Sequence, residues 1–266
     1  MTTVKAIVEK IEQLAPRELA EEWDPIGLSF GTYQQAVKKV FVALDVDPVT
    51  LEEAKAVGAD LIVTHHPLIF NSVHTLNGED SKRQLFIELI KNDIAVYSAH
   101  TNMDRADQGM NEWLADALKL QQIEPMMPLD TDPKAGFGRV GFLNEPLSME
   151  KLINQLKKVF DLSNVRYNEV EPKEQYQKIA VMGGAGADFY RAAQAKDAEL
   201  YITGDISYHQ AQDMLREGLA FIDVGHFVEN IFVKRMTEQL ENWATSENWA
   251  LEIIPSQKQK DVFKFY

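Results

Sequence analysis

The chain has 266 residues, of which 45% are hydrophobic, and a formal net charge of -14 at pH 7. This length suits one large domain or two small ones, with a sizeable hydrophobic core. A surface this acidic repels phosphate backbones, so we expect no general nucleic-acid binding, and no apolar run approaches the roughly 18 residues that a membrane span needs.

Cysteine is absent, which excludes disulfides and thiolate metal ligands. Glu9 and Glu12 interrupt the apolar pattern at the N-terminus, which argues against a signal peptide. We therefore expect a cytoplasmic protein.

The first half of the chain alternates between helix and strand patterns. Residues 4–14 carry apolar side chains at helical spacing, with Pro16 beyond the end of the predicted helix. Further helices are predicted at 48–59, 81–93 and 109–120, and buried strands at 38–46, 60–64 and 94–100.

Residues 124–133 interrupt this alternation. Three prolines and three acidic residues in this stretch predict a linker. The pattern resumes with strands at 137–143, 164–170 and 178–184 and a helix at 148–160. We therefore expect a first α/β unit at 1–123, the linker, and a second α/β unit at 134–266 that completes the functional site.

The two halves resemble one another. Residues 39–66 align with 178–205 without a gap, and seven of the 28 positions are identical. The segments 94–104 and 220–229 also correspond, each with a strand, a small residue, a histidine and then an acid. The pattern predicts an α/β fold of two similar units from an internal duplication, with mostly parallel sheets covered by helices. The alternative is that any two βα units look alike.

Histidines gather where the predicted strands end. In open parallel sheets, ligands bind beyond the carboxyl ends of the strands. Asp104, Asp205 and Glu229 accompany these histidines, and imidazole with carboxylate is the ligand set for zinc, manganese, iron, cobalt or nickel. Five of the six histidines lie at or just after strand ends: His65, His66, His100, His209 and His226.

His65 and His66 form an adjacent pair after the strand at 60–64. Successive side chains of an extended segment point in opposite directions, so we expect each histidine to reach a different metal ion. Two-metal sites hold their ions roughly 3.5–4 Å apart, usually with a bridging ligand. The alternative is that one or both side chains pack in a turn.

Several motifs together resemble the Nif-three-like dinuclear metal protein family, whose members are often called GTP cyclohydrolase 1 type 2 homologues. The matching stretches are "EEWDPIGLSFG", "LIVTHHPLIF", "YSAHTNMD", "YITGDISYHQAQD" and "DVGHFVEN", which span nearly the full length. Pro25 departs from the motif, in which asparagine is expected. The chain is similar to the short form of the family, without an inserted mid-chain domain.

The resemblance implies two interlocked α/β units with a dinuclear metal centre between them, and a homohexameric ring. It also implies two divalent ions per chain, with Glu229 as the bridge. The implied ligands are His65, His66, Asp104, His226 and Glu229.

Other residues carry weaker expectations. His100 is expected to support Asp104 or to transfer protons, with a direct metal-ligand role as the alternative. His209 is expected to act as a general acid or as a structural helix residue. Asp205 corresponds to His66 in the repeat and is expected to line the cavity. The glycine-rich stretch 181–190 is either an anion-binding turn or a tight structural turn.

Three functions are compatible with these features. The first is a metal-dependent hydrolase that attacks a small, possibly phosphorylated or nucleotide substrate with a metal-bound hydroxide. The second is a non-catalytic metal-binding or scaffold protein with a regulatory or partner-binding role. The third is a nucleotide-binding regulator that uses the glycine-rich turn.

Overall fold

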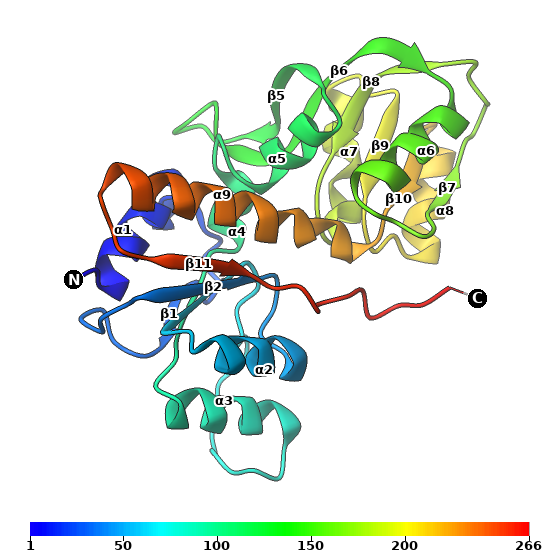
Figure 1. The fold of residues 1–266 in the computed structure, drawn as a ribbon. Helices are drawn as coiled ribbons and strands as arrows, with labels where there is room; N and C mark the ends of the chain where they lie inside the picture. Colours follow the sequence, from blue (N-terminus) through cyan, green and yellow to red (C-terminus); the bar gives the residue numbers. More distant parts are fainter. Residues whose placement is uncertain (266) are drawn as a thin grey trace. The chain divides into compact units, whose positions relative to one another are not determined.

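The computed structural model describes residues 1–265, and the chain forms two compact units (Figure 1). Unit 1 consists of Met1–Met103 and Phe232–Lys260. Unit 2 consists of Asp104–Ile231 and residues 261–265. The sequence placed a single boundary at 124–133, whereas the chain changes unit within one helix near residue 103 and at the start of another near residue 231.

The sheet of unit 1 is mostly parallel, as the sequence predicts. Strands β2, β3, β4 and β11 run parallel to their neighbours, and β1 pairs antiparallel with β4. The sequence analysis predicted neither β1 nor β11. Strand β11 comes from the C-terminal part of the chain and extends the sheet beside β2. In spatial order, the strands are β1 (Gly27–Phe30), β4 (Ala95–Ser98), β3 (Leu61–Thr64), β2 (Lys39–Ala43) and β11 (Glu252–Pro255).

Helices cover both faces of this sheet. Helices α2 and α3 lie against one face and α1 and α9 against the other (Figure 1). On the α2–α3 face, Phe41, Ile62 and Val96 of the sheet form a core with Leu51 and Phe86 of the helices. Helix bounds are α1 (Val4–Leu14), α2 (Pro48–Val57), α3 (Ser81–Lys91) and α9 (Ile231–Ser246), with a short 3-10 turn η1 (Arg17–Leu19) after α1.

The ends of α2 illustrate how local sequence sets the elements. The side chain of Asp47 accepts hydrogen bonds from the N–H groups of Val49 and Thr50, and Pro48 occupies the first helical position. Gly58 ends the helix in the left-handed conformation, at φ 67°. The hydrogen-bonding groups at both ends of α2 therefore have partners, and the chain continues from Gly58 into β3.

Unit 2 contains a mixed sheet of six strands. Strands β8, β9 and β10 are parallel, while β5, β6 and β7 pair antiparallel with their neighbours. The sheet is thus less parallel than the sequence suggested, because β5 and β6 form a hairpin at one edge and β7 adds an antiparallel strand at the other. In spatial order, the strands are β5 (Gln121–Pro128), β6 (Gly136–Leu147), β8 (Tyr176–Val181), β9 (Leu200–Thr203), β10 (Ala220–Asp223) and β7 (Arg166–Asn168).

The expected linker at 124–133 begins inside a strand. Residues 121–128 form β5, which pairs with β6, and a turn follows that returns the chain into β6. Proline is tolerated here because β5 lies at the edge of the sheet, where a missing N–H donor costs little.

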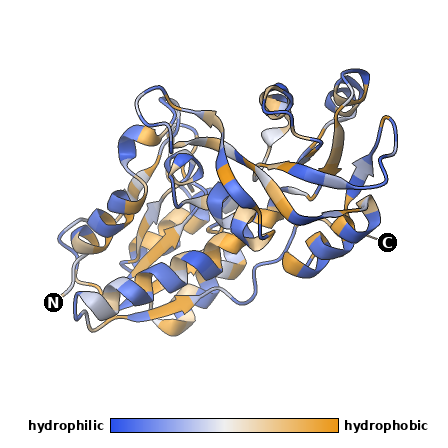
Figure 2. Ribbon diagram, turned by 90° about the horizontal axis from the view of Figure 1, so that it is seen from above, coloured by the Kyte–Doolittle hydropathy of each residue, from blue (hydrophilic) through white to orange (hydrophobic). Residues whose placement is uncertain are grey.

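The core of unit 2 lies between its sheet and its helices. Tyr201 and Ala180 of the sheet pack with Tyr190 and Ala193 of α7 and with Met214 of α8. Hydrophobic residues concentrate on the strands, whereas the helices carry both kinds of residue (Figure 2). Helix bounds are α4 (Thr101–Arg105), α5 (Met110–Ala117), α6 (Met149–Val159), α7 (Tyr190–Ala195) and α8 (Tyr208–Arg216), with 3-10 turns η2 (Gly186–Phe189) and η3 (His226–Asn230).

Within residues 1–265, no helix is long and apolar enough to cross a membrane.

The two sheets share a central pattern. The order β4-β3-β2 in unit 1 corresponds to β10-β9-β8 in unit 2, each with an antiparallel strand beside the first. Asp60 accepts from the N–H groups of Lys38 and Lys39, and Glu199 accepts from those of Gln177 and Lys178 in the same way. These shared contacts agree with the alignment of 39–66 on 178–205.

Candidate metal centre

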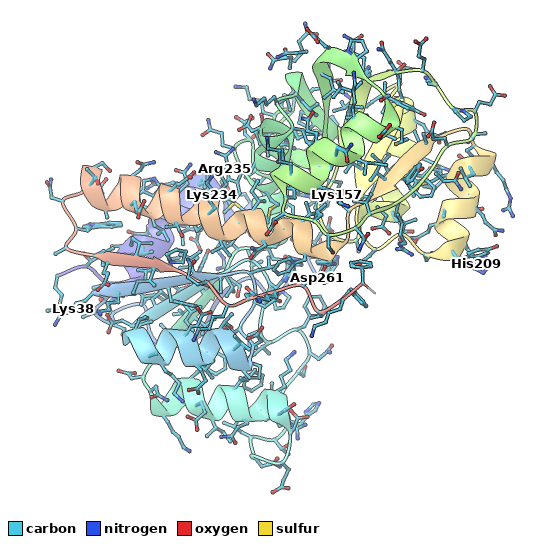
Figure 3. All side chains as sticks on the ribbon, turned by 45° about the vertical axis from the view of Figure 1, so that its right-hand side comes forward. Lys38, Lys157, His209, Lys234, Arg235 and Asp261 are labelled. Atoms are coloured by element: carbon cyan, nitrogen blue, oxygen red, sulfur yellow. The ribbon has the colours of Figure 1, made fainter. Side chains whose placement is uncertain are left out.

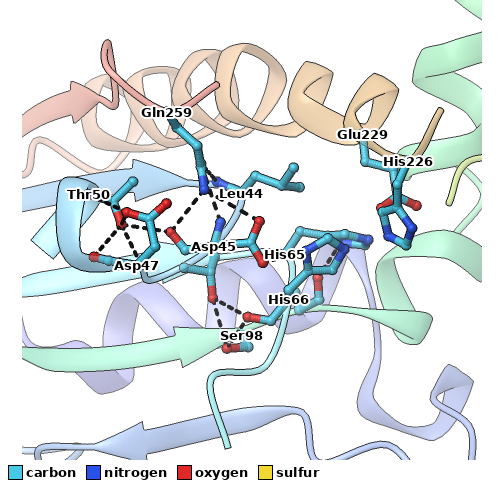
Figure 4. A network of polar contacts seen from close by, with 12 residues as sticks. Leu44, Asp45, Asp47, Thr50, His65, His66, Ser98, His226, Glu229 and Gln259 are labelled. Atoms are coloured by element: carbon cyan, nitrogen blue, oxygen red, sulfur yellow. Dashed lines mark hydrogen bonds and ion pairs between the residues drawn. The ribbon is translucent and has the colours of Figure 1, made fainter. Parts of the chain in front are cut away.

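The histidine pair follows β3 in unit 1. All four residues of β3 are buried, and His65 is fully buried at its carboxyl end while His66 is half-buried. Nδ1 of His65 lies 2.9 Å from the carbonyl oxygen of Ala99, and Nδ1 of His66 lies 2.8 Å from Oδ1 of Asp45 (Figure 4). Because both partners are acceptors, each Nδ1 carries the proton and each Nε2 carries the lone pair.

The two rings lie beside one another rather than on opposite sides. Their centroids are 5.0 Å apart, and both contact the ring of His100, at 5.1 Å from His65 and 5.6 Å from His66. The expectation of opposite directions is therefore wrong. The chain bends at residues 65–66, so the alternation of an extended strand does not apply there.

His100 completes this histidine cluster of unit 1. His65, His66 and His100 each offer a ligand atom, and these atoms all lie within 4.8 Å of one another. Nδ1 of His100 lies 3.1 Å from both carboxylate oxygens of Asp24. The cluster therefore presents three nitrogen donors to one small volume, which is a donor set suited to a divalent transition metal.

Asp24 is the buried partner of this cluster. Its side chain is fully buried, and it also accepts from the N–H of Thr101 at 2.9 Å and from the hydroxyl of Thr101 at 2.5 Å. Burial raises the pKa of this carboxyl, but the hydrogen bonds from His100 and Thr101 outweigh burial and hold the pKa below its usual value. Asp24 is thus ionised at neutral pH.

Unit 2 holds a second cluster, which contains both implied carboxylate ligands. Ligand atoms of Asp104 and Glu229 lie within 4.8 Å of one another, and Nε2 of His226 lies 3.2 Å from Oε2 of Glu229. Nδ1 of His226 lies 2.7 Å from Oδ2 of Asp205, so the lone pair of this histidine is on Nε2, which faces Glu229. Figure 4 shows His226 beside Glu229. Asp205 adopts φ 53°, a left-handed conformation that aspartate tolerates better than most residues.

The glycine-rich turn after β8 surrounds Glu229. A Cβ atom would lie 2.9 Å from Oε1 of Glu229 if added at Gly183, and 2.6 Å if added at Gly184. Glu229 is almost fully buried. The glycines therefore make room for this carboxylate, which gives the turn a structural use beside the metal-ligand candidates.

Asn111 connects the turn to Asp104. Its side-chain oxygen accepts from the N–H of Gly183 at 3.0 Å, and its side-chain nitrogen donates to the carbonyl oxygen of Asp104 at 3.0 Å. Asn111 is buried on α5. One amide thus fixes the backbone next to both carboxylates of unit 2.

We expect Asn111→Ala to lower the free energy of unfolding by about 2 kcal/mol, because the Gly183 N–H loses its acceptor in a buried place. Urea denaturation would measure this loss. Asn77→Ala is the control, because the side chain of Asn77 is exposed and water can replace its hydrogen bond from the N–H of Glu79. Equal stability of Asn111→Ala and wild type would contradict a stabilising connection by Asn111 between Gly183 and Asp104.

The strand registers reveal which site residues correspond. Leu61 pairs with Ala95 in unit 1, and Leu200 pairs with Ala220 in unit 2. Asp104 and Glu229 each follow the second member of its pair by nine positions. His100 then corresponds to Gly225 and not, as the sequence motif suggested, to His226. In this register the two carboxylates coincide, and the two histidines differ by one position.

His209 stands apart from the clusters. It is exposed on α8, and its Nδ1 lies 3.4 Å from Oε1 of Gln212 (Figure 3). None of the candidate metal-ligating groups among residues 1–265 includes it. The structure therefore gives no support for the general-acid role considered for His209.

Two acceptors were missed by the sequence analysis. Asp45 follows β2 and Asp24 lies in a loop, and neither stands next to a histidine in the chain. Asp24 does fall within the "EEWDPIGLSFG" stretch, and its place in a motif of the family was the one indication in the sequence that it belongs to the site.

Comparisons with known proteins bear on this geometry. The family described as Duf34/NIF3 (NGG1p interacting factor 3) matches residues 2–262. A Streptococcus pneumoniae protein named GTP cyclohydrolase 1 type 2 homolog is 38% identical over 260 residues, which cover 97% of each chain. A Bacillus subtilis protein of the same name is 28% identical, and the 363 aligned positions cover 97% of each chain. Since 363 exceeds the 266 residues present here, that relative has extra residues that this chain lacks.

Solved structures agree with the sequence relatives. The Bacillus cereus protein related to NIF3 has a TM-score of 0.94 and 26% identity, and the match covers 100% of this chain and 99% of that one. HcgD from Methanocaldococcus jannaschii has a TM-score of 0.80 and 32% identity, with 95% and 97% covered. The resemblance predicted from the motifs is confirmed: this chain belongs to the DUF34/NIF3 family, in its short form.

Proposed function

We propose that the chain is a dinuclear metal-binding protein that acts as a metal-dependent hydrolase on a small substrate. The observation that carries the proposal is the shared arrangement of the imidazoles. Nδ1 of His65, His66 and His226 lies beside an oxygen acceptor in each case, so that Nε2 is the nitrogen that carries the lone pair. Fixed tautomers of this kind are the usual companion of metal-ligating histidines.

The proposed ligands come from both clusters. Unit 1 supplies neutral nitrogen donors, and unit 2 supplies two carboxylates and His226, so that two ions with about four ligands each need donors from both sets. The ligands would be His65, His66, Asp104, His226 and Glu229, with Glu229 as the bridge.

Two divalent ions, of zinc, manganese, iron, cobalt or nickel, would supply Lewis acidity toward the substrate and would activate water near neutral pH. The chain's own part is to hold the donors in place. The acceptors Asp45 and Asp205 keep the rings of His66 and His226 in one orientation. The glycine turn keeps the carboxylate of Glu229 in its buried place.

A pocket in unit 1 borders the histidine pair. It has a volume of about 250 Å³ and is lined by Asp45, Asp47, His66, Leu68 and Lys82, among others. This size suits part of a small molecule. The names of the relatives favour a nucleotide or another phosphorylated compound, and the family resemblance favours a cytoplasmic homohexameric ring.

The test starts from protein purified without chelator. Elemental analysis is expected to give two ions per chain, and His65→Ala is expected to lose about one. A panel of phosphoesters and GTP then measures turnover for both proteins. Turnover that persists at the wild-type rate in His65→Ala would show that the assay reports a contaminant.

The second candidate is a non-catalytic metal-binding or scaffold role. It is favoured by the exposed place of His209, which leaves His100 as the remaining candidate for proton transfer. Tight retention of two ions with no turnover across the panel would support this role over the hydrolase.

A further inference from the structure

Asp24 differs from the other carboxylates that hold histidines. The side chain of Asp24 is 0% exposed, whereas Asp45 is 44% exposed beside His66 and Asp205 is 41% exposed beside His226. Burial of an ionised carboxylate is costly unless hydrogen bonds compensate for it. Asp24 must therefore be held by specific partners, and those partners are His100 and Thr101.

The contacts of Asp24 fix its orientation. Oδ2 accepts from both the N–H and the hydroxyl of Thr101, the residue that follows His100 in the chain. The imidazole of His100 is thus tied to the same carboxylate as the backbone next to it. The neighbouring Trp23 packs edge-on against His100, with centroids 6.3 Å apart.

We propose that Asp24 is the positioning residue of the candidate metal centre that sets the tautomer and ring orientation of His100, so that Nε2 of His100 faces His65 and His66. The inference rests on the proposed function and deepens it. It assigns the acidic residue of the "EEWDPIGLSFG" stretch a role that neither the motif nor the metal-ligand set accounts for.

The chemistry follows from the hydrogen-bond inventory of the two groups. An ionised carboxylate only accepts, so the neutral imidazole must carry its proton on Nδ1. Nε2 is then a lone-pair donor toward a ligand, or an acceptor toward a proton of bound substrate. Without Asp24, the ring is free to take the other tautomer and to rotate, and the donor set of the cluster becomes incomplete.

The test compares Asp24→Asn with wild type in metal-free protein. The amide keeps the shape, and its oxygen is held at the place of Oδ2 by the N–H of Thr101. Its NH₂ group then faces Nδ1 of His100 as a donor, which favours the proton on Nε2. Two-bond ¹H–¹⁵N correlation spectra of histidine-labelled protein at about pH 8 distinguish the tautomers, and the His100 signals are assigned from their loss in His100→Gln.

We expect His100 to be the Nδ1–H tautomer in wild type and to shift toward Nε2–H in Asp24→Asn. Asp213→Asn is the matched control, because the side chain of Asp213 on α8 is half-exposed and pairs with Arg216. Circular dichroism confirms that each variant is folded, and Asp24→Glu serves as a second variant if Asp24→Asn does not fold. For Asp24→Glu, which keeps the charge, we expect the wild-type tautomer to return.

The metal-loaded proteins provide a second readout. Loss of an outer partner of a ligand typically costs about 10–100-fold in metal affinity or activity, and we expect a loss of this size in Asp24→Asn and none in Asp213→Asn. An unchanged His100 tautomer in Asp24→Asn would overturn the inference, whatever the turnover. Absence of turnover in wild type with the tautomer shift present would sink the hydrolase proposal and leave the positioning role in place.

Discussion

Glu229→Gln is expected to abolish tight metal binding and, with it, any metal-dependent turnover. The substitution keeps the size of the side chain and removes one negative charge. In unit 2, Glu229 is almost fully buried, with Asp104 and His226 as neighbours. A carboxylate that bridges two cations contributes to the binding of both, so its loss should exceed the 10–100-fold effect typical of an outer partner. We therefore expect the affinity for both ions to fall by more than about 100-fold.

Isothermal titration of metal into chelator-stripped protein measures this change. Glu238→Gln is the matched control, because the side chain of Glu238 on α9 is half-exposed and its Oε2 lies 3.9 Å from Nη1 of Arg235. We expect wild-type affinity in the control. Two ions retained at wild-type affinity in Glu229→Gln would exclude a bridging role for this residue and would require another carboxylate at the centre.

Much of the fold could be predicted because its central elements have strong local signals. The segments 60–64 and 94–100 are short and apolar, and each is followed by polar residues at a strand end, so β3 and β4 were predictable. The pairing of β11 with β2 was not predictable in this way. It joins residues more than 200 positions apart, and nothing in the four residues of β11 specifies which edge they extend.

The candidate site likewise has residues that could be predicted from local sequence and residues that could not. The metal-ligand candidates lie on local motifs at strand ends, whereas their acceptors are distant in sequence. Asp24 and His100 are separated by 76 positions, and Asp45 and His66 by 21. The bend at His65 and His66 was missed because the alternation rule holds only while the strand continues, and β3 ends at Thr64.

The glycine-rich turn shows how the structure changes the interpretation of a motif. From the sequence, Gly184 could serve an anion-binding turn or a tight structural turn. In unit 2, its φ is 57° and an added Cβ would lie 2.6 Å from Oε1 of Glu229. Glycine is therefore required at position 184 for two reasons: the left-handed backbone conformation, and the space that the carboxylate of Glu229 occupies.

Gly184→Ala is therefore expected to lose metal binding as well as stability. The left-handed backbone costs an L-residue about 1–2 kcal/mol, and the new methyl group pushes the carboxylate of Glu229 away from Asp104 and His226. Urea denaturation measures the first effect and metal titration the second. We expect the metal affinity to fall nearly as far as in Glu229→Gln.

Gly58→Ala separates the two causes. Gly58 has φ 67° at the end of α2, and an added Cβ would meet nothing within 4 Å. This control should lose a similar 1–2 kcal/mol of stability, from the backbone alone, and should keep full metal affinity. Metal affinity that is intact in Gly184→Ala, together with a loss of nucleotide binding, would favour the anion-binding turn instead. The backbone strain of a left-handed alanine is the same in Gly184→Ala and Gly58→Ala. A difference in metal affinity between these two variants therefore comes from the contact with Glu229.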